Sequence, residues 1–112
     1  MCETKKLKKV LELLVQSYRD VYGSNIMDII LYGSYARGDY TEESDIDVVA
    51  VVHGTRIELQ KKLKNVWDCA AEIGLENDVI LSPTVIPYDE FVRYRNTLPY
   101  YKNIAEEGKK IG

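Results

Sequence analysis

The chain opens with a helical pattern of apolar residues and continues with two short apolar runs. Apolar positions recur every three or four residues up to Val21, with charged residues between them, which predicts an amphipathic helix ending near Gly23. The run 26–32, Ile-Met-Asp-Ile-Ile-Leu-Tyr, is short and β-branched, which predicts a buried strand. The run 45–53 contains Val-Val-Ala-Val-Val, a composition typical of a strand covered on both faces.

A second amphipathic helix is predicted to follow. Thr55 stands three residues before Glu58, which is the spacing of a capping box at a helix start, and Gly74 is suited to a left-handed C-terminal cap. Cys69, which lies within this predicted helix, is expected to be a core residue. The predicted core side of this helix consists of Leu59, Leu63, Val66, Trp67, Ala70 and Ile73.

The remaining segments predict a strand and two short helices. A strand is expected over 78–86, at an edge or broken at Pro83 because proline has no amide to donate. Segments 88–95 and 100–107 have the pattern of short helices. The alternation of helices and strands indicates one α/β or α+β domain over residues 1–112, with a small sheet flanked by helices.

Composition and charge exclude several classes of function. No apolar run approaches the roughly 20 residues that span a bilayer, and the first residues lack a signal sequence, so we expect a cytoplasmic protein without a membrane partner. Cys2 and Cys69 match no metal or redox spacing, which favours reduced thiols. The net charge of −3 argues against nucleic acid as a partner. The basic cluster of the first helix, predicted to be a solvated surface, is Lys5, Lys6, Lys8 and Lys9.

Two acidic residues stand at the start of the second predicted strand. Asp45 and Asp47 are two positions apart, so both carboxylates project from the same side of the strand. Two like charges held this close on a largely buried strand are unfavourable unless a cation lies between them. Carboxylate oxygens favour Mg²⁺, which usually completes its shell with phosphate oxygens and water. The pair therefore predicts a magnesium and phosphate site.

A small-residue turn follows the first predicted strand. Gly33 lets the backbone approach a ligand closely, and Ser34 offers a hydroxyl, which together suit the phosphates of a nucleotide. Arg37 follows at close spacing and has two interpretations. It either meets phosphate charge or forms a salt bridge to Asp39 or to the acidic pair.

A third carboxylate on a neighbouring strand would complete a site for two ions. Asp78 is the candidate, because it opens the third predicted strand and shares a face with Ser82. The alternative is an ordinary exposed aspartate at the start of a strand.

The combination of Gly33-Ser34, ten intervening residues and Asp45-x-Asp47 closely resembles the nucleotidyltransferase superfamily typified by DNA polymerase beta. The match is clearest over residues 29–52, and it is to the minimal nucleotidyltransferases within that superfamily. The resemblance implies a small mixed sheet, contact of Ser34 with nucleotide phosphates, and Mg²⁺ on the two aspartates. A third acidic residue often completes the set in this family, which implies that role for Asp78.

Stand-alone members of this size look like the antitoxins of toxin–antitoxin pairs whose toxin is a HEPN ribonuclease. The resemblance implies transfer of AMP from ATP to a tyrosine of that partner, with two Mg²⁺ ions. A partner protein or a second copy of the chain is expected to form part of the acceptor site. The nine tyrosines also suit an interface, although the sequence singles out none of them. Two other functions stay open, namely transfer to a small molecule such as an aminoglycoside and a silent module that binds a toxin.

Overall fold

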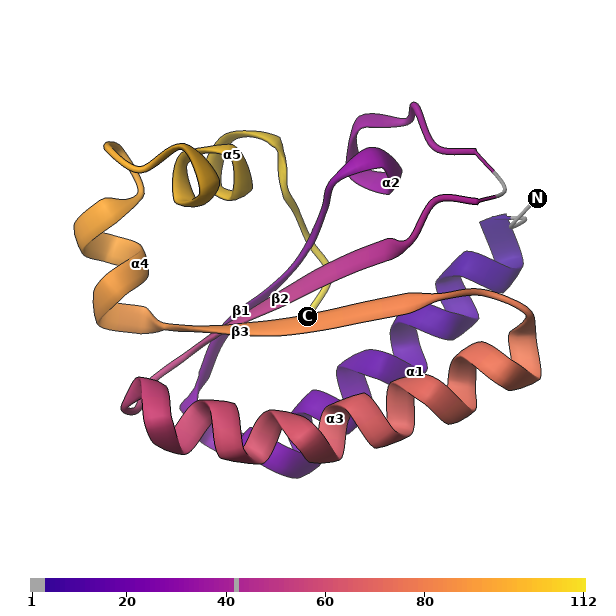
Figure 1. The fold of residues 1–112 in the computed structure, drawn as a ribbon, viewed down its shortest axis with the longest axis horizontal. Coiled ribbons are helices and arrows are strands. Elements are labelled where there is room, and N and C mark those ends of the chain that lie inside the picture. Colours follow the sequence, from indigo (N-terminus) through magenta and orange to yellow (C-terminus); the bar gives the residue numbers. More distant parts are fainter. Residues whose placement is uncertain (1–3, 42) are drawn as a thin grey trace.

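The computed structural model describes residues 4–41 and 43–112, and it confirms a fold of mixed helices and strands. In chain order the elements are α1 (Thr4–Tyr22), η1 (Gly23–Asn25), β1 (Ile26–Tyr32), α2 (Ser34–Arg37), β2 (Ile46–Val52), α3 (Arg56–Asn77), β3 (Leu81–Pro87), α4 (Tyr88–Tyr94), α5 (Pro99–Glu107) and β4 (Lys109–Lys110). Within these residues the strands form one four-stranded sheet in the order β3-β2-β1-β4 (Figure 1). β1 is antiparallel to β2 and β4, and β2 is parallel to β3, so the sheet is mixed as expected.

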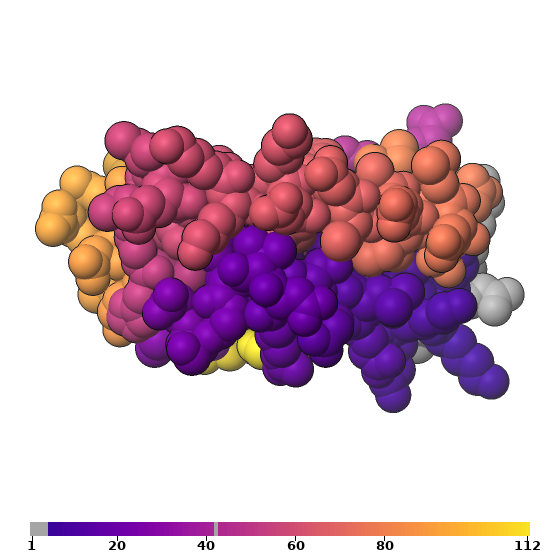
Figure 2. Space-filling view, turned by 90° about the horizontal axis from the view of Figure 1, so that it is seen from below, coloured from indigo at the N-terminus to yellow at the C-terminus, as the bar shows by residue number. Residues whose placement is uncertain are grey.

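One face of the sheet carries the larger hydrophobic core. α1 and α3 lie side by side beneath this face, as Figures 1 and 2 show. Alternate residues of β2, namely Ile46, Val48, Ala50 and Val52, are buried against the two helices. Tyr18 of α1 is also buried and donates its hydroxyl to the carbonyl of Thr84 at 2.8 Å. This face is therefore occupied by packing.

The opposite face of the sheet is only partly covered. α4 and α5 lie over it toward one end, while α2 lies toward the other (Figure 1). The apolar side chains beneath α4 and α5 form a smaller cluster of Ile30, Val49, Val51, Ile86, Phe91 and Ile104. The start of β2, beside α2, lies at the less covered end. This is where the two predicted acidic residues fall.

Several elements agree closely with the sequence prediction. β1 matches the predicted strand, and the hydroxyl of Thr55 accepts a hydrogen bond from the Glu58 amide at 3.3 Å at the start of α3. Pro83 lies in an edge strand, as proline requires. The predicted basic surface of α1 is also largely exposed. Cys2 lies outside the described residues.

The predicted end of α3 was wrong. The helix continues past Gly74 to Asn77 and ends at Asp78, whose φ of 55° and ψ of 47° place it in the left-handed region. Gly74 does not cap the helix. A glycine is needed there because a Cβ would lie 2.6 Å from the carbonyl oxygen of Val79. The glycine permits the returning chain to pass close to the helix. β3 consequently begins at Leu81, later than expected.

The burial of Trp67 and Cys69 was also predicted wrongly. Trp67 is 45% exposed, and Cys69 is exposed as a free thiol. The buried stripe of α3 runs through Leu59, Leu63, Val66, Ala70 and Ile73. At about 100° per residue, Trp67 and Cys69 lie roughly 80° to either side of the centre of this stripe. α3 packs through a narrow stripe, so both side chains reach solvent.

No helix within the described parts of the chain is long and apolar enough to cross a membrane.

Candidate active site

Asp47 is the second residue of β2 and Asp45 directly precedes this strand, and Asp47 shares the less covered face of the sheet with Val49 and Val51. Asp47 stands in register with Tyr32 of β1 on one side and with Ser82 of β3 on the other. The Ser82 hydroxyl donates to a carboxylate oxygen of Asp45 at 3.4 Å. Asp45 is exposed and Asp47 is half-buried. The two carboxylates therefore share one face, with a serine hydroxyl beside them.

The turn after β1 is built around the Asp47 carboxylate. Gly33 adopts a φ of 76° and a ψ of −154°, a combination that residues with a Cβ rarely adopt. A Cβ at this position would lie only 2.6 Å from Oδ2 of Asp47. The Gly33 carbonyl then accepts hydrogen bonds from the amides of Ala36 and Arg37, both at 3.1 Å, in the single turn of α2. The structure thus places Gly33 against Asp47, and Ser34 follows as the first residue of α2.

The carboxylate pair is electrostatically unfavourable in the absence of a cation. Burial raises the pKa of the Asp47 carboxyl above its ordinary value of 3.8, and the neighbouring charge of Asp45 raises it further. The guanidinium of Arg37 acts in the opposite direction and lowers it. A divalent cation held by both carboxylates would relieve the same repulsion more directly.

Arg37 takes part in ion pairs at the rim of the site. Its Nε lies 3.3 Å from Oδ2 of Asp39, which is one of the two interpretations of its role from the sequence. Its Nη1 also lies 3.7 Å from Oε2 of Glu107, at the end of α5. Arg37 therefore links α2 to α5 while its charge acts on Asp47.

Asp78 is not brought to the acidic pair. It caps the C-terminus of α3, three residues before β3 begins, because the helix runs one turn further than expected. Across the described residues, no group of three or more acidic, histidine or cysteine side chains is placed to hold a metal ion. The position on β3 beside Asp47 is instead Ser82.

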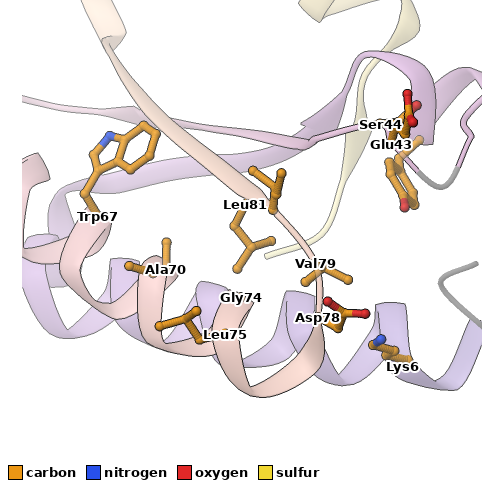
Figure 3. A pocket seen from close by; sticks show the side chains of 13 residues that line it. Lys6, Glu43, Ser44, Trp67, Ala70, Gly74, Leu75, Asp78, Val79 and Leu81 are labelled. Atoms are coloured by element: carbon orange, nitrogen blue, oxygen red, sulfur yellow. The ribbon is translucent and has the colours of Figure 1, made fainter.

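Asp78 lines an open pocket of ≈ 970 Å³ between α3, the start of β3 and the segment before β2. Figure 3 shows Asp78 beside Lys6 and Val79, with Trp67 toward the other end of the pocket. Glu43 and Ser44, just before the acidic pair, also line it. The pocket thus adjoins the site without including Asp45 or Asp47.

Two tyrosines complete the acidic face, and the sequence did not identify either. The hydroxyls of Tyr32 and Tyr100 lie 3.2 Å apart, and their rings meet edge to face with centroids 6.1 Å apart. Burial raises the pKa of the Tyr32 hydroxyl, with smaller contributions in the same direction from Tyr100 and from the charge of Asp47. Tyr32 directly precedes the Gly33 turn, which was a usable signal. The position of Tyr100 depends on the packing of α5 and has no local signal.

The chain is similar over nearly its whole length to a known protein family. The family model described as nucleotidyltransferase domain matches residues 7–111. The chain belongs to this family. The enzyme class and the fold implied by the sequence resemblance are therefore confirmed for this nucleotidyltransferase.

Curated relatives of this nucleotidyltransferase come from Methanocaldococcus jannaschii. "Putative protein adenylyltransferase MJ0604" is 33% identical over 111 residues, which are 99% of each chain. "Putative protein adenylyltransferase MJ0141" is 33% identical over 82 residues, which are 69% of this chain and 79% of the relative.

Solved structures share the fold at lower sequence identity. The structure described as "Crystal structure of the toxin-antitoxin with AMP-PNP" matches with a TM-score of 0.55 and 17% identity, over 89% of this chain and 70% of that chain. A mutant form of the toxin-antitoxin MntA-HpeT matches with a TM-score of 0.55, 15% identity and the same coverage. At this identity the similarity is one of fold.

Proposed function

We propose that this nucleotidyltransferase transfers AMP from ATP to a tyrosine hydroxyl of a partner protein. The observation that carries the proposal is the pair Asp45 and Asp47 on one sheet face, against the turn at Gly33. The relative that matches the full length carries the name of a protein adenylyltransferase, which supports AMP as the transferred group and protein as the acceptor. The structure with AMP-PNP shares the fold, which supports ATP as the donor.

The donor set of the site fits Mg²⁺. Asp45 and Asp47 supply hard carboxylate oxygens, and burial, followed by the charge of Asp45, raises the pKa of the Asp47 carboxyl. These two residues would hold the ion, with the Ser82 hydroxyl beside them. When bound, Mg²⁺ supplies charge neutralisation for the triphosphate.

The turn after β1 would position the phosphates. Gly33 has no side chain to separate the backbone from a ligand, and Ser34 adds a hydroxyl at the start of α2. The positive charge of Arg37 lowers the pKa of the Asp47 carboxyl. The same charge would offset part of the negative charge of the phosphates. The contribution of these residues is to orient the α-phosphate for attack and to stabilise the charge of the leaving pyrophosphate.

The two-carboxylate site favours a phenolic acceptor over an alcohol. Among the described residues no third carboxylate joins Asp45 and Asp47 in a group that could hold a metal ion, so deprotonation of the acceptor would depend more on the acidity of its own hydroxyl. A tyrosine hydroxyl has an ordinary pKa of about 10 and ionises far more readily than an aliphatic hydroxyl. This supports tyrosine as the acceptor rather than the hydroxyls of an aminoglycoside.

The proposed partner is a HEPN-type toxin, with this chain as its antitoxin. Support comes from the resemblance to antitoxins of that kind and from the fold shared with toxin–antitoxin structures. Large apolar side chains are exposed on and after α3, including Trp67, Leu75 and Ile80, all of which line the open pocket. Clustered exposed apolar side chains suit a protein-binding surface.

The proposal predicts that label from α-labelled ATP passes to the toxin in the presence of Mg²⁺. Asp45→Asn and Asp47→Asn should each lower the transfer rate by at least about a hundredfold, because each removes charge from the proposed cation site. The matched control is Asp78→Asn, in which asparagine tolerates the left-handed conformation. The control should retain the rate of the unsubstituted protein.

Loss of transfer in Asp78→Asn would show that this carboxylate acts in catalysis. A second candidate function, toxin neutralisation by contact alone, is favoured by the absence of Asp78 from the pair. Cells expressing the toxin distinguish the two functions. Protection by the Asp45→Asn, Asp47→Asn double variant would count against the enzymatic proposal.

A further inference from the structure

Two tyrosines of the chain itself, Tyr32 and Tyr100, meet on the sheet face that carries Asp47. Tyr32 is opposite Asp47 on the neighbouring strand, so its side chain rises from the sheet on the same side as the acidic pair. The Tyr32 hydroxyl lies 3.2 Å from the hydroxyl of Tyr100, which α5 brings over this face. Tyr100 is 48% exposed, so its side chain is largely accessible to solvent.

Several other tyrosines make their contacts away from the acidic pair. Tyr18 and Tyr22 are buried in the core beneath the sheet and donate to backbone carbonyls. The ring of Tyr88 lies against His53, after the far end of β2. The Tyr101 hydroxyl accepts from the guanidinium of Arg56 at 3.3 Å, at the start of α3. Tyr100 therefore combines exposure with a link to the residue opposite Asp47.

We propose that Tyr100 is a site of self-modification, at which the chain attaches the AMP group of its own ATP substrate. This inference rests on the proposed function and adds an acceptor. A bond forms between the Tyr100 Oη and the α-phosphorus of ATP, and the bond from that phosphorus to the bridging oxygen of the β-phosphate breaks. Pyrophosphate leaves with the electron pair, and the phenolic proton passes to water.

Tyr32 acts as a positioning residue for this reaction. Its hydroxyl holds the Tyr100 hydroxyl, and its ring meets the Tyr100 ring edge to face. Since acceptor and donor site belong to one molecule, the reaction is intramolecular and benefits from high effective concentration. Its rate constant should therefore not depend on protein concentration.

The experiment incubates the purified full chain with ATP and Mg²⁺ and measures intact mass, the modified peptide and pyrophosphate release. The expected result is one AMP group per chain on Tyr100, formed at a rate constant unchanged over a tenfold dilution. Tyr100→Phe should remove the modification, and Tyr32→Phe should slow it without abolishing it. The matched control is Tyr94→Phe, whose ring stacks on Tyr101 in the same pair of helices and has no hydroxyl contact with Tyr32. Thermal melts confirm that each variant folds.

Two results would overturn the inference. AMP that remains bound at full stoichiometry in Tyr100→Phe would place the acceptor elsewhere. Pyrophosphate release that depends on Asp47, with no AMP on the chain, would exclude self-modification and leave the proposed function intact. Absence of both pyrophosphate release and transfer to any acceptor would overturn the proposed function as well.

Discussion

At the scale of single residues, Gly33 is required both by the backbone conformation of its turn and by its contact with Asp47. Its conformation has positive φ, and the space of a Cβ is already occupied by Oδ2 of Asp47 at 2.6 Å. The two constraints act independently, since one concerns backbone strain and the other concerns contact with a proposed metal ligand. A side chain here would disturb folding and the site together.

Gly33→Ala should destabilise the protein by about 2–4 kcal/mol, from positive-φ strain and the displaced carboxylate. Gly23→Ala is the control, because Gly23 also has positive φ, at 59°, but nothing lies within 4 Å of its Cβ position. That control should lose only about 1 kcal/mol. Urea denaturation measures both values. Equal losses in the two variants would show that the Asp47 contact contributes nothing.

Asp47 should reduce stability at neutral pH in the absence of Mg²⁺. Because burial and Asp45 raise the pKa of this carboxyl in the folded state, folding favours its protonated form. The stability contributed by the protonated carboxyl is fully present below the unfolded value of 3.8 and is lost as pH rises through the raised folded pKa. Asp47→Asn mimics the protonated form. This variant should be more stable than the unsubstituted protein at pH 7, with the difference shrinking toward pH 3, as measured by urea unfolding without metal.

A variant that is less stable than the unsubstituted protein at pH 7 would contradict this view of Asp47. The same substitution is expected to lower the transfer rate by at least about a hundredfold, so Asp47 would support function while it lowers the stability of the fold.

At the scale of elements, the end of α3 decides where Asp78 lies. The helix continues beyond Gly74, and this glycine allows the backbone of Val79 to pack closely against the helix. The left-handed residue at the end of the helix is Asp78. Glycine adopts the left-handed conformation with little strain, whereas aspartate pays a modest penalty.

Asp78→Gly should therefore stabilise the protein by up to about 1 kcal/mol. It should leave the transfer rate unchanged, because Asp78 does not join the acidic pair. Denaturation and the transfer assay measure the two effects separately. Asp78→Ala is the paired control and should lower stability. A stabilised but inactive glycine variant would restore Asp78 as a functional carboxylate.

The elements also show what local sequence could predict. Strand alternation fixed the shared side of Asp45 and Asp47, and the capping box fixed the start of α3, because both depend on residues a few positions apart. The end of α3 and the exposure of Trp67 depend on which strands the helix covers. The approach of Tyr100 to Tyr32 spans 68 positions and depends on how α5 packs. Such contacts have no signature within a short window.

At the scale of the whole molecule, buried tyrosines make the stability of the fold sensitive to alkaline pH. Burial raises the pKa of the Tyr22 hydroxyl to about 12, and burial also raises the pKa of Tyr18 and Tyr32. Groups with raised folded values stabilise the protein fully below their unfolded value of 10.0, and this stability is lost as pH rises through the folded values. The fold should therefore weaken above about pH 10.

The free energy of unfolding should fall between about pH 10 and pH 12, with proton release on unfolding. Tyr22→Phe removes one titrating group and should flatten the decline, although it also leaves the Leu59 carbonyl without its hydroxyl donor. Urea midpoints measured at intervals of pH test this. Parallel curves for the variant and the unsubstituted protein would indicate that Tyr22 does not contribute.

The sheet separates the larger hydrophobic core on one face from the acidic residues and a smaller apolar cluster on the other. α1 and α3 supply the larger core on one face, whereas α4 and α5 contribute a smaller apolar cluster on the face that carries Asp47. Exchange of the segment after Pro87 would consequently change the surroundings of Asp47 and leave most of the larger core in place. Residues that face the proposed chemistry can therefore vary on one side of the sheet while the core on the other side keeps the fold.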